Sequence, residues 1–157
     1  MTIRFLQIVL ILVVLIGLGV IAIVIWARTA PRPTNLGVTN SQLAPCPATP
    51  NCVTTQAGQP DQRMQPLSYT SAPEAAQERL LQVVQSLPRT KVIENRAGYV
   101  AVEFRSAFFG FIDDVEFLFD TENNQIHFRS ASRLGHSDMG VNRMRMEQIS
   151  RAFSTNA

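Results

Sequence analysis

The sequence predicts an α+β protein: an N-terminal transmembrane helix, followed by a domain with the order helix, four-stranded antiparallel meander, helix. Three observations lead to this fold class. A long apolar segment opens the chain, a proline-rich segment without apolar periodicity follows, and the remainder changes from helical spacing to alternation and back. We therefore divide the 157 residues into an anchor (1–28), a tether with a cysteine pair (29–70) and a domain (71–157).

The anchor is predicted from residues 5–27, which carry no formal charge and only one strongly polar side chain, Gln7. At about 1.5 Å per residue they span roughly 34 Å, more than a hydrocarbon core of about 30 Å. Arg4 and Arg28 flank them, and Trp26 stands where an interfacial anchor is expected. A cleaved signal peptide is the alternative, although its apolar region is usually only about 7–15 residues long. We expect an uncleaved single-pass anchor in the cell membrane, with the C-terminal domain outside the cytoplasm.

The net charge of +2 is concentrated around this anchor. Three of the 14 basic residues are Arg4, Arg28 and Arg32, so the remaining 11 face 12 acidic residues and leave the rest about one unit negative. This balance argues against broad nucleic-acid binding, and we expect no nucleic-acid partner. Acidic residues gather within 113–122 and arginines within 129–151, and we expect the two groups to pair in the folded domain.

The tether contains seven of the nine prolines and, within "PCPATPNC", the only two cysteines, Cys46 and Cys52. Zinc-binding cysteines are usually separated by two to four residues and redox-active pairs by two, whereas five separate these. We therefore expect no metal and no other cofactor. A disulfide between Cys46 and Cys52, closing a short loop, suits a domain outside the cytoplasm.

The first helix of the domain is predicted between two prolines. Ser71 is a suitable N-cap, Pro73 suits the first turn and Pro88 ends the helix. Four strand-like runs follow, at 90–95, 99–105, 114–120 and 125–131. Their alternation and short connections indicate an antiparallel meander with one buried face.

The last helix is expected to begin after Ser137 or Asp138, either of which is a competent N-cap. An apolar stripe gives this helix a buried side: Val141, Met144, Ile149, Ala152 and Phe153. Two helices packed on the apolar face of the sheet would enclose one core.

Three separated motifs make the chain recognisable: "APCPATPNCV", "FFGFIDDVEFLFD" and "IHFRSASRLGHSDMGVNRMRMEQI". In this order they resemble the domain-of-unknown-function family DUF1499, over roughly residues 36–153. The resemblance implies a small domain, often membrane-tethered or exported, with no agreed activity. It implies no catalytic residues.

An anion site is predicted where the last strand leads into the last helix. The N–H groups at a helix start can hold an anion, and guanidinium groups suit phosphate or carboxylate. We expect Arg129, Arg133 and Arg143 to form this site with Ser137. The alternative is that Asp138 is itself the anion that these arginines bind.

An interaction loop is predicted at Phe108, Phe109 and Phe111, which surround Gly110 between two strands. These rings either cap the core or form an exposed apolar patch that contacts a protein or a lipid. With the arginine cluster, they favour a non-enzymatic binding or scaffold module for a protein or an anionic lipid head group.

A hydrolase of cell-envelope material, using the charged sheet face, is the alternative function. Asp114 and Glu116 project from one face about 6.6 Å apart, a separation found in inverting glycosidases. Cross-strand ion pairs explain the mixed charges on that face more simply. We assign no catalytic residue.

Overall fold

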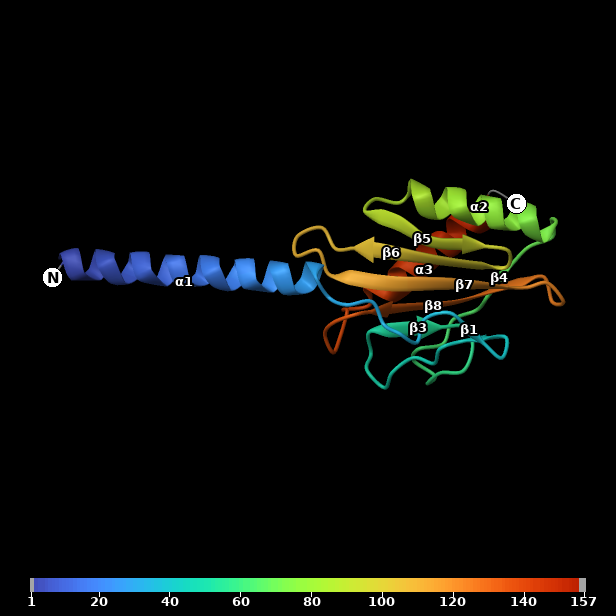
Figure 1. Cartoon of the computed structure of the whole chain (residues 1–157), viewed down its shortest axis with the longest axis horizontal. Coiled ribbons are helices and arrows are strands. Elements are labelled where there is room, and N and C mark those ends of the chain that lie inside the picture. Colours follow the sequence, from blue (N-terminus) through green and yellow to red (C-terminus); the bar gives the residue numbers. More distant parts are fainter. Residues whose placement is uncertain (1, 156–157) are drawn as a thin grey trace.

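The computed structural model describes residues 2–155 (Figure 1). It confirms an α+β fold with an apolar N-terminal helix and an antiparallel sheet. The elements in order are α1 (Thr2–Arg28), β1 (Val38–Thr39), β2 (Gln42–Leu43), β3 (Cys52–Thr54), β4 (Leu67–Ser68), α2 (Pro73–Ser86), β5 (Thr90–Arg96), β6 (Tyr99–Arg105), β7 (Ile112–Asp120), β8 (Gln125–Ser132) and α3 (Val141–Thr155).

The main sheet has six strands, so the prediction of four was too low. Its order is β3-β8-β7-β6-β5, and β4 pairs with β8 beyond β3. The two extra strands come from residues 29–70, the segment predicted as a tether. They are only two or three residues long, too short to show alternation, and they occupy the edge of β8 that the meander alone would leave open.

Both helices pack on one face of this sheet. Ala76, Leu80 and Val84 of α2 and Ile149 of α3 join the main apolar core. Pro73 occupies the first turn of α2 as predicted, but the N-cap position is Ala72, without a side-chain hydrogen bond, so the assignment of Ser71 was wrong.

The buried stripe of α3 differs from the predicted one. Asn142, Met146, Ile149 and Phe153 are buried at helical spacing, whereas Val141 and Met144 are exposed. Asn142 faces the sheet because its amide nitrogen donates to the carbonyl of Asn51, 3.1 Å away, and its amide oxygen accepts from Ser130. This polar contact turns the two apolar side chains of the first helical turns away from the core.

The opposite face of the sheet is also covered, although alternation predicted only one buried face. Residues 30–43 cross it (Figure 1). Leu43 packs there against Tyr99 and Ala101 in a second, small apolar cluster. The amide nitrogen of Gly37 donates to Glu116 at 2.6 Å. The charged face predicted for solvent is therefore an interior layer.

The strands run between two ends of the domain. At one end, which we call the α1 end, α1 joins the domain (Figure 1). The side chain of Arg133 donates there to the carbonyl of Ala30, 3.1 Å away. At the other, the far end, residues 121–124 connect β7 to β8. The loop at 106–111 and the segment at 133–140 both lie at the α1 end.

Candidate functional site

The four residues predicted to bind an anion do not converge in the structure. Arg129 and Arg133 lie on the face covered by residues 30–43 and pair with carboxylates of β6 and β7. Arg143 instead donates to the carbonyls of Asp61 and Arg63, at 2.5 and 3.3 Å. The expected pairing of acidic and basic groups is confirmed, but the partners are spread along the sheet.

Arg133 is the centre of the larger charge cluster. Its Nε and Nη2 donate to the two oxygens of Asp114, each at 2.7 Å, and Nη2 also donates to Glu103. The side chain is only 5% exposed. The hydrogen bonds to Asp114 raise the pKa of the guanidinium further above its usual value, so Arg133 remains charged at any ordinary pH. Arg133 therefore makes hydrogen bonds to β6, to β7 and to the segment that follows α1.

Glu116 is the centre of the second cluster and is fully buried. One of its oxygens accepts from the hydroxyl of Tyr99 at 2.7 Å, and the other lies 3.5 Å from Nη1 of Arg129. Burial and the hydrogen bond to Glu116 raise the pKa of Tyr99. Asp114 and Glu116, the pair considered for a hydrolase, are thus each held by an arginine beneath the covering segment.

The backbone N–H groups at the start of α3 donate to side chains of the segment that immediately precedes the helix. Asp138 accepts from the amide nitrogens of Gly140 and Asn142, at 3.0 and 2.7 Å, and Ser137 accepts from Met139 at 3.2 Å. Asp138 caps the helix, one of the two predicted caps. The prediction that arginines bind Asp138 was wrong, because Arg129, Arg133 and Arg143 all have other partners.

The phenylalanine loop is exposed and lies against the end of α1. Phe108 is 88% exposed and Phe109 41%, whereas Phe111 is partly buried. Gly110 has a φ of +76°, and a Cβ placed on it would lie 2.8 Å from Cγ of Arg28. The loop therefore approaches α1 closely at the residue where that helix ends. Of the two alternatives, an exposed patch describes Phe108 and Phe109.

Other exposed apolar side chains belong to the same end of the domain. Among the described residues outside α1, the exposed large hydrophobic side chains are Phe108, Phe109, Met139, Val141 and Met144. The first two are in the loop before β7, and the others are in the segment that leads from β8 into the first turns of α3 (Figure 1). A surface of this kind is typical of contact with a membrane or a protein.

A groove of about 240 Å³ opens beside these residues. We call it the α1-end groove. The turn at 87–89, Phe104, Arg105, Val141, Met144 and Arg145 line it, together with Gln148. Its lining thus combines apolar side chains with three arginines and contains no acidic residue.

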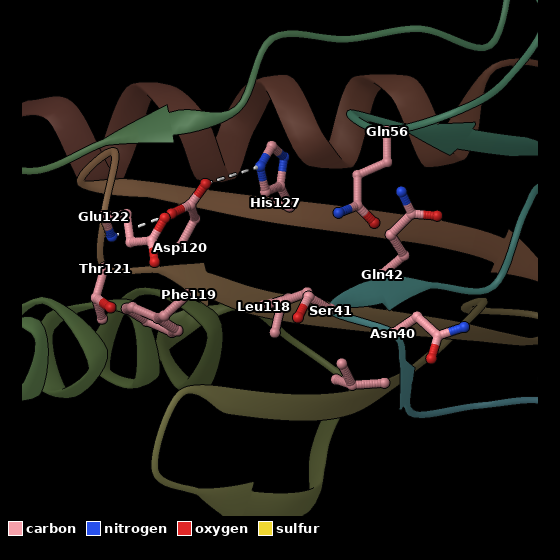
Figure 2. Close-up of a pocket in the computed structure, with 11 residues that line it drawn as sticks. Asn40, Ser41, Gln42, Gln56, Leu118, Phe119, Asp120, Thr121, Glu122 and His127 are labelled. Carbon is pink, nitrogen blue, oxygen red and sulfur yellow. Dashed lines mark hydrogen bonds and ion pairs between the residues drawn. The ribbon is translucent and has the colours of Figure 1, made fainter.

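The far end carries a larger pocket, of about 430 Å³, which we call the far-end pocket. Figure 2 shows its walls: the β1–β2 hairpin on one side and the ends of β7 and β8 on the other. Polar side chains dominate the lining: amides, hydroxyls, carboxylates and one imidazole, from Asn40, Ser41, Gln42, Gln56, Asp120, Thr121, Glu122 and His127. Groups that both donate and accept hydrogen bonds suit a neutral polar ligand.

Asp120 is structural within the far-end pocket. It accepts from the amide nitrogen of Glu122 at 3.1 Å (Figure 2). It also accepts from the side chain of Asn123 at 2.7 Å and from the amide nitrogen of Asn123 at 3.1 Å. These bonds, led by that of the Asn123 side chain, lower the pKa of Asp120. Oδ2 of Asp120, which accepts from the Asn123 side chain, also lies 3.8 Å from Nε2 of His127. The other ring nitrogen of His127 is 3.1 Å from the hydroxyl of Thr55.

Metal-binding geometry is absent from the part of the chain that the structure describes, where no three His, Cys, Asp or Glu side chains gather suitably. Cys46 and Cys52 form the predicted disulfide. The residues that sequence reasoning missed are Arg89 and the exposed Met144 of the α1-end groove. No motif marks Arg89, and Met144 has the spacing of a core residue.

The chain matches the family model of a protein of unknown function (DUF1499) over residues 42–153, more than half of its length. No curated protein and no solved structure matches it. The matched range begins at β2 and ends within α3, so it includes the disulfide and the whole six-stranded sheet. The chain therefore belongs to the DUF1499 family, as its three motifs indicated.

Proposed function

We propose that the protein is a non-enzymatic binding module, anchored by α1 as a single-pass helix, whose domain lies against the bilayer outside the cytoplasm. Residues Ile3–Arg28 are long and apolar enough to cross a membrane. The observation that carries the proposal is the gathering of exposed apolar side chains at the α1 end. Apolar side chains exposed to water gain nothing by lying together at this end, whereas side chains in contact with the bilayer would be removed from water there.

The phenylalanine loop supports direct lipid contact. Trp26 and Arg28 are residue types that mark the boundary between hydrocarbon and head groups at the end of a membrane-spanning helix. The loop touches Arg28, so it lies at the same depth. Transfer of an exposed phenylalanine side chain from water into an apolar layer contributes about 2 kcal/mol. Phe108 would therefore hold the domain against the lipid surface.

The disulfide supports a location outside the cytoplasm. Disulfides persist in oxidising compartments and are rare in the cytosol, where thiols are kept reduced. Cys46 and Cys52 lie close beyond the anchor, so the compartment that oxidises them also contains the domain.

Depth-dependent fluorescence quenching tests this proposal. The full chain carrying Trp26→Phe and Phe108→Trp would be reconstituted into phosphatidylcholine vesicles that contain brominated acyl chains. We expect the tryptophan emission to be blue-shifted, and quenched most strongly by lipids brominated near the glycerol backbone. The matched control is Trp26→Phe with Thr121→Trp, because Thr121 is exposed in the far-end turn.

Quenching of the far-end tryptophan should be weak at every bromine depth. Equal quenching at positions 108 and 121 would contradict the proposed orientation of the domain. A mature protein that begins after residue 28 would contradict the anchor itself.

A further inference from the structure

The α1-end groove has an unusual combination of charge and apolar surface. Arg105 and Arg145 line it, but each has an acidic partner outside the lining: Glu103 lies 3.3 Å from Arg105, and Asp113 lies 2.5 Å from Arg145. Arg89 has no such partner among the residues that the structure describes. One uncompensated positive charge therefore stands at the rim of the groove.

Arg89 is exposed, and two hydrogen bonds to the backbone of Arg105 position it at the rim. Its amide oxygen accepts from the backbone nitrogen of Arg105 at 3.1 Å, and its Nε donates to the carbonyl of Arg105 at the same distance. The two terminal guanidinium nitrogens have no protein partner within residues 2–155. Arg89 also has a φ of +58°, a left-handed conformation that is costly for a residue other than glycine. Glycine would fit this backbone conformation better than arginine does.

The apolar wall of the groove comes from α3. Met144 is 58% exposed and Val141 is also exposed, and both line the groove together with Phe104. The guanidinium of Arg145 covers the Phe104 ring, 4.7 Å from its centroid. An occupant of the groove therefore meets an apolar surface on the α3 side and a cation on the side of the turn at 87–89.

We propose that the α1-end groove binds one anionic phospholipid of the bilayer that anchors the protein. The phosphate pairs with Arg89, and the glycerol and the first methylenes of an acyl chain lie on Val141 and Met144. The inference rests on the proposed function, because only a domain held against the bilayer brings the groove to lipid. The occupant is lipid rather than an acidic peptide because two residues that line the groove, Val141 and Met144, are among the exposed apolar side chains of the α1 end.

Methionine methyl NMR provides a direct test with the native side chain. The full chain, labelled with ¹³C at the methionine methyl groups, would be placed in phosphatidylcholine nanodiscs containing 0–30% phosphatidylglycerol. We expect the Met144 resonance to move with the anionic fraction and to saturate. Met64, which packs against the core, should not move and is the internal reference.

Two variants of Arg89 separate binding from folding. Arg89→Gln should raise the phosphatidylglycerol fraction at half-saturation roughly fivefold, the effect of about one arginine at an anionic surface. Arg89→Gly should weaken binding equally without lowering the unfolding midpoint, because glycine accepts the positive φ. The control is Arg96→Gln, which removes the same charge from the far end and should leave binding unchanged.

Three results would overturn the inference. In the first, the chemical shift of Met144 does not change with the phosphatidylglycerol fraction, while the tryptophan of the Phe108→Trp chain is still quenched by brominated lipid. This result would disprove the groove as a lipid site and leave the proposed orientation intact. A shift produced by glycerol phosphate alone in phosphatidylcholine nanodiscs would show a site for a soluble anion. Equal weakening by Arg89→Gln and Arg96→Gln would reduce the effect to general surface charge.

Discussion

The two ends of the domain expose different kinds of side chain. The α1 end exposes phenylalanine, methionine and arginine side chains, and no carboxylate lines its groove. The far end exposes amides, hydroxyls and the carboxylate of Glu122, and neither arginine nor lysine lines its pocket. The same three strands, β6, β7 and β8, reach both ends. Polarity therefore changes along the strands as well as across the sheet.

This difference shows what an alternating pattern can and cannot predict. Successive strand residues point to opposite faces, so a period of two sorts residues by face. The position of a residue along its strand determines the end of the domain at which it lies. The period of two does not show which side chains an end exposes, because this depends on the segments that are connected to the strands there. Here α1 enters at one end, and the large exposed apolar groups that the structure describes outside α1 are found at that end.

The largest expected effect is a loss in the free energy of unfolding when an arginine of a buried ion pair at the α1 end is replaced. Replacement of an arginine of an exposed pair at the far end should cost much less. Arg133→Gln leaves Asp114 and Glu103 buried without their main cationic partner. Loss of one member of a buried pair costs about 3–5 kcal/mol. We expect the free energy of unfolding of the full chain in detergent micelles, measured with guanidinium chloride, to fall by that amount.

The matched control for Arg133→Gln is Arg96→Gln at the far end. Arg96 pairs with Glu94 at 2.8 Å, but both side chains are largely exposed. Exposed pairs contribute about 0–1 kcal/mol, and the contact of Arg96 with the Tyr99 ring, 4.5 Å from its centroid, adds about 0.5–1 kcal/mol. This variant should therefore lose clearly less stability than Arg133→Gln. Similar losses for the two variants would show that the cluster around Arg133 is less important to the fold than its burial indicates.

An intermediate effect is expected for the disulfide, which lies beside the α1 end of β3. Replacement of both cysteines, Cys46→Ser with Cys52→Ser, releases a loop with a sequence separation of 6. For so short a loop the chain-entropy model gives about 2 kcal/mol. The same unfolding measurement, with and without reductant, checks this value.

The cysteine pair also reports on the compartment. In protein alkylated directly in the cell, neither cysteine should be labelled, because a disulfide has no thiol to react. Rapid labelling of Cys46 and Cys52 would place the domain in a reducing compartment and contradict the proposed location, whatever the stability of the variant.

The strands β6, β7 and β8 could be predicted from the sequence because each is long enough to show its period. Alternation assigned Val115 and Phe117 to the apolar core and Glu116 to the other face, and the structure places them so. The disulfide followed from cysteine spacing, and the capping role of Asp138 from its position before an apolar stripe. In each case the deciding information was local.

The parts that could not be predicted depend on contacts between distant segments. β3 and β4 are strands only because the edge of β8 pairs with them. The partner of Arg129 follows from its register opposite Glu116, which turn lengths alone do not determine. The α1-end groove combines the turn at 87–89 with the start of α3, two segments that no motif connects. The arginines of the predicted anion site are separated for the same reason, because Arg129 and Arg133 meet carboxylates of other strands. Arg143 instead meets the backbone carbonyls of Asp61 and Arg63.

The smallest expected effect concerns the turn at the far end, where the charges are exposed. Asp120→Asn keeps an acceptor for the backbone N–H groups of Glu122 and Asn123 but loses the bond from the Asn123 side chain. We expect a loss of about 1 kcal/mol in the free energy of unfolding at pH 7. Glu122→Gln, at a carboxylate with no protein partner among residues 2–155, should change nothing and is the control.

The pH dependence of Asp120→Asn gives the sharper test. The folded state lowers the pKa of Asp120, so the carboxylate stabilises the fold above its unfolded pKa, about 3.9, and this contribution disappears as pH falls through the lower folded value. The difference between the unmodified protein and Asp120→Asn should therefore be constant above about pH 5 and narrow progressively below about pH 4. Unfolding measured from pH 7 to pH 3 checks this, and a difference that stays constant over the whole range would mean that the carboxylate charge does not stabilise the far-end turn.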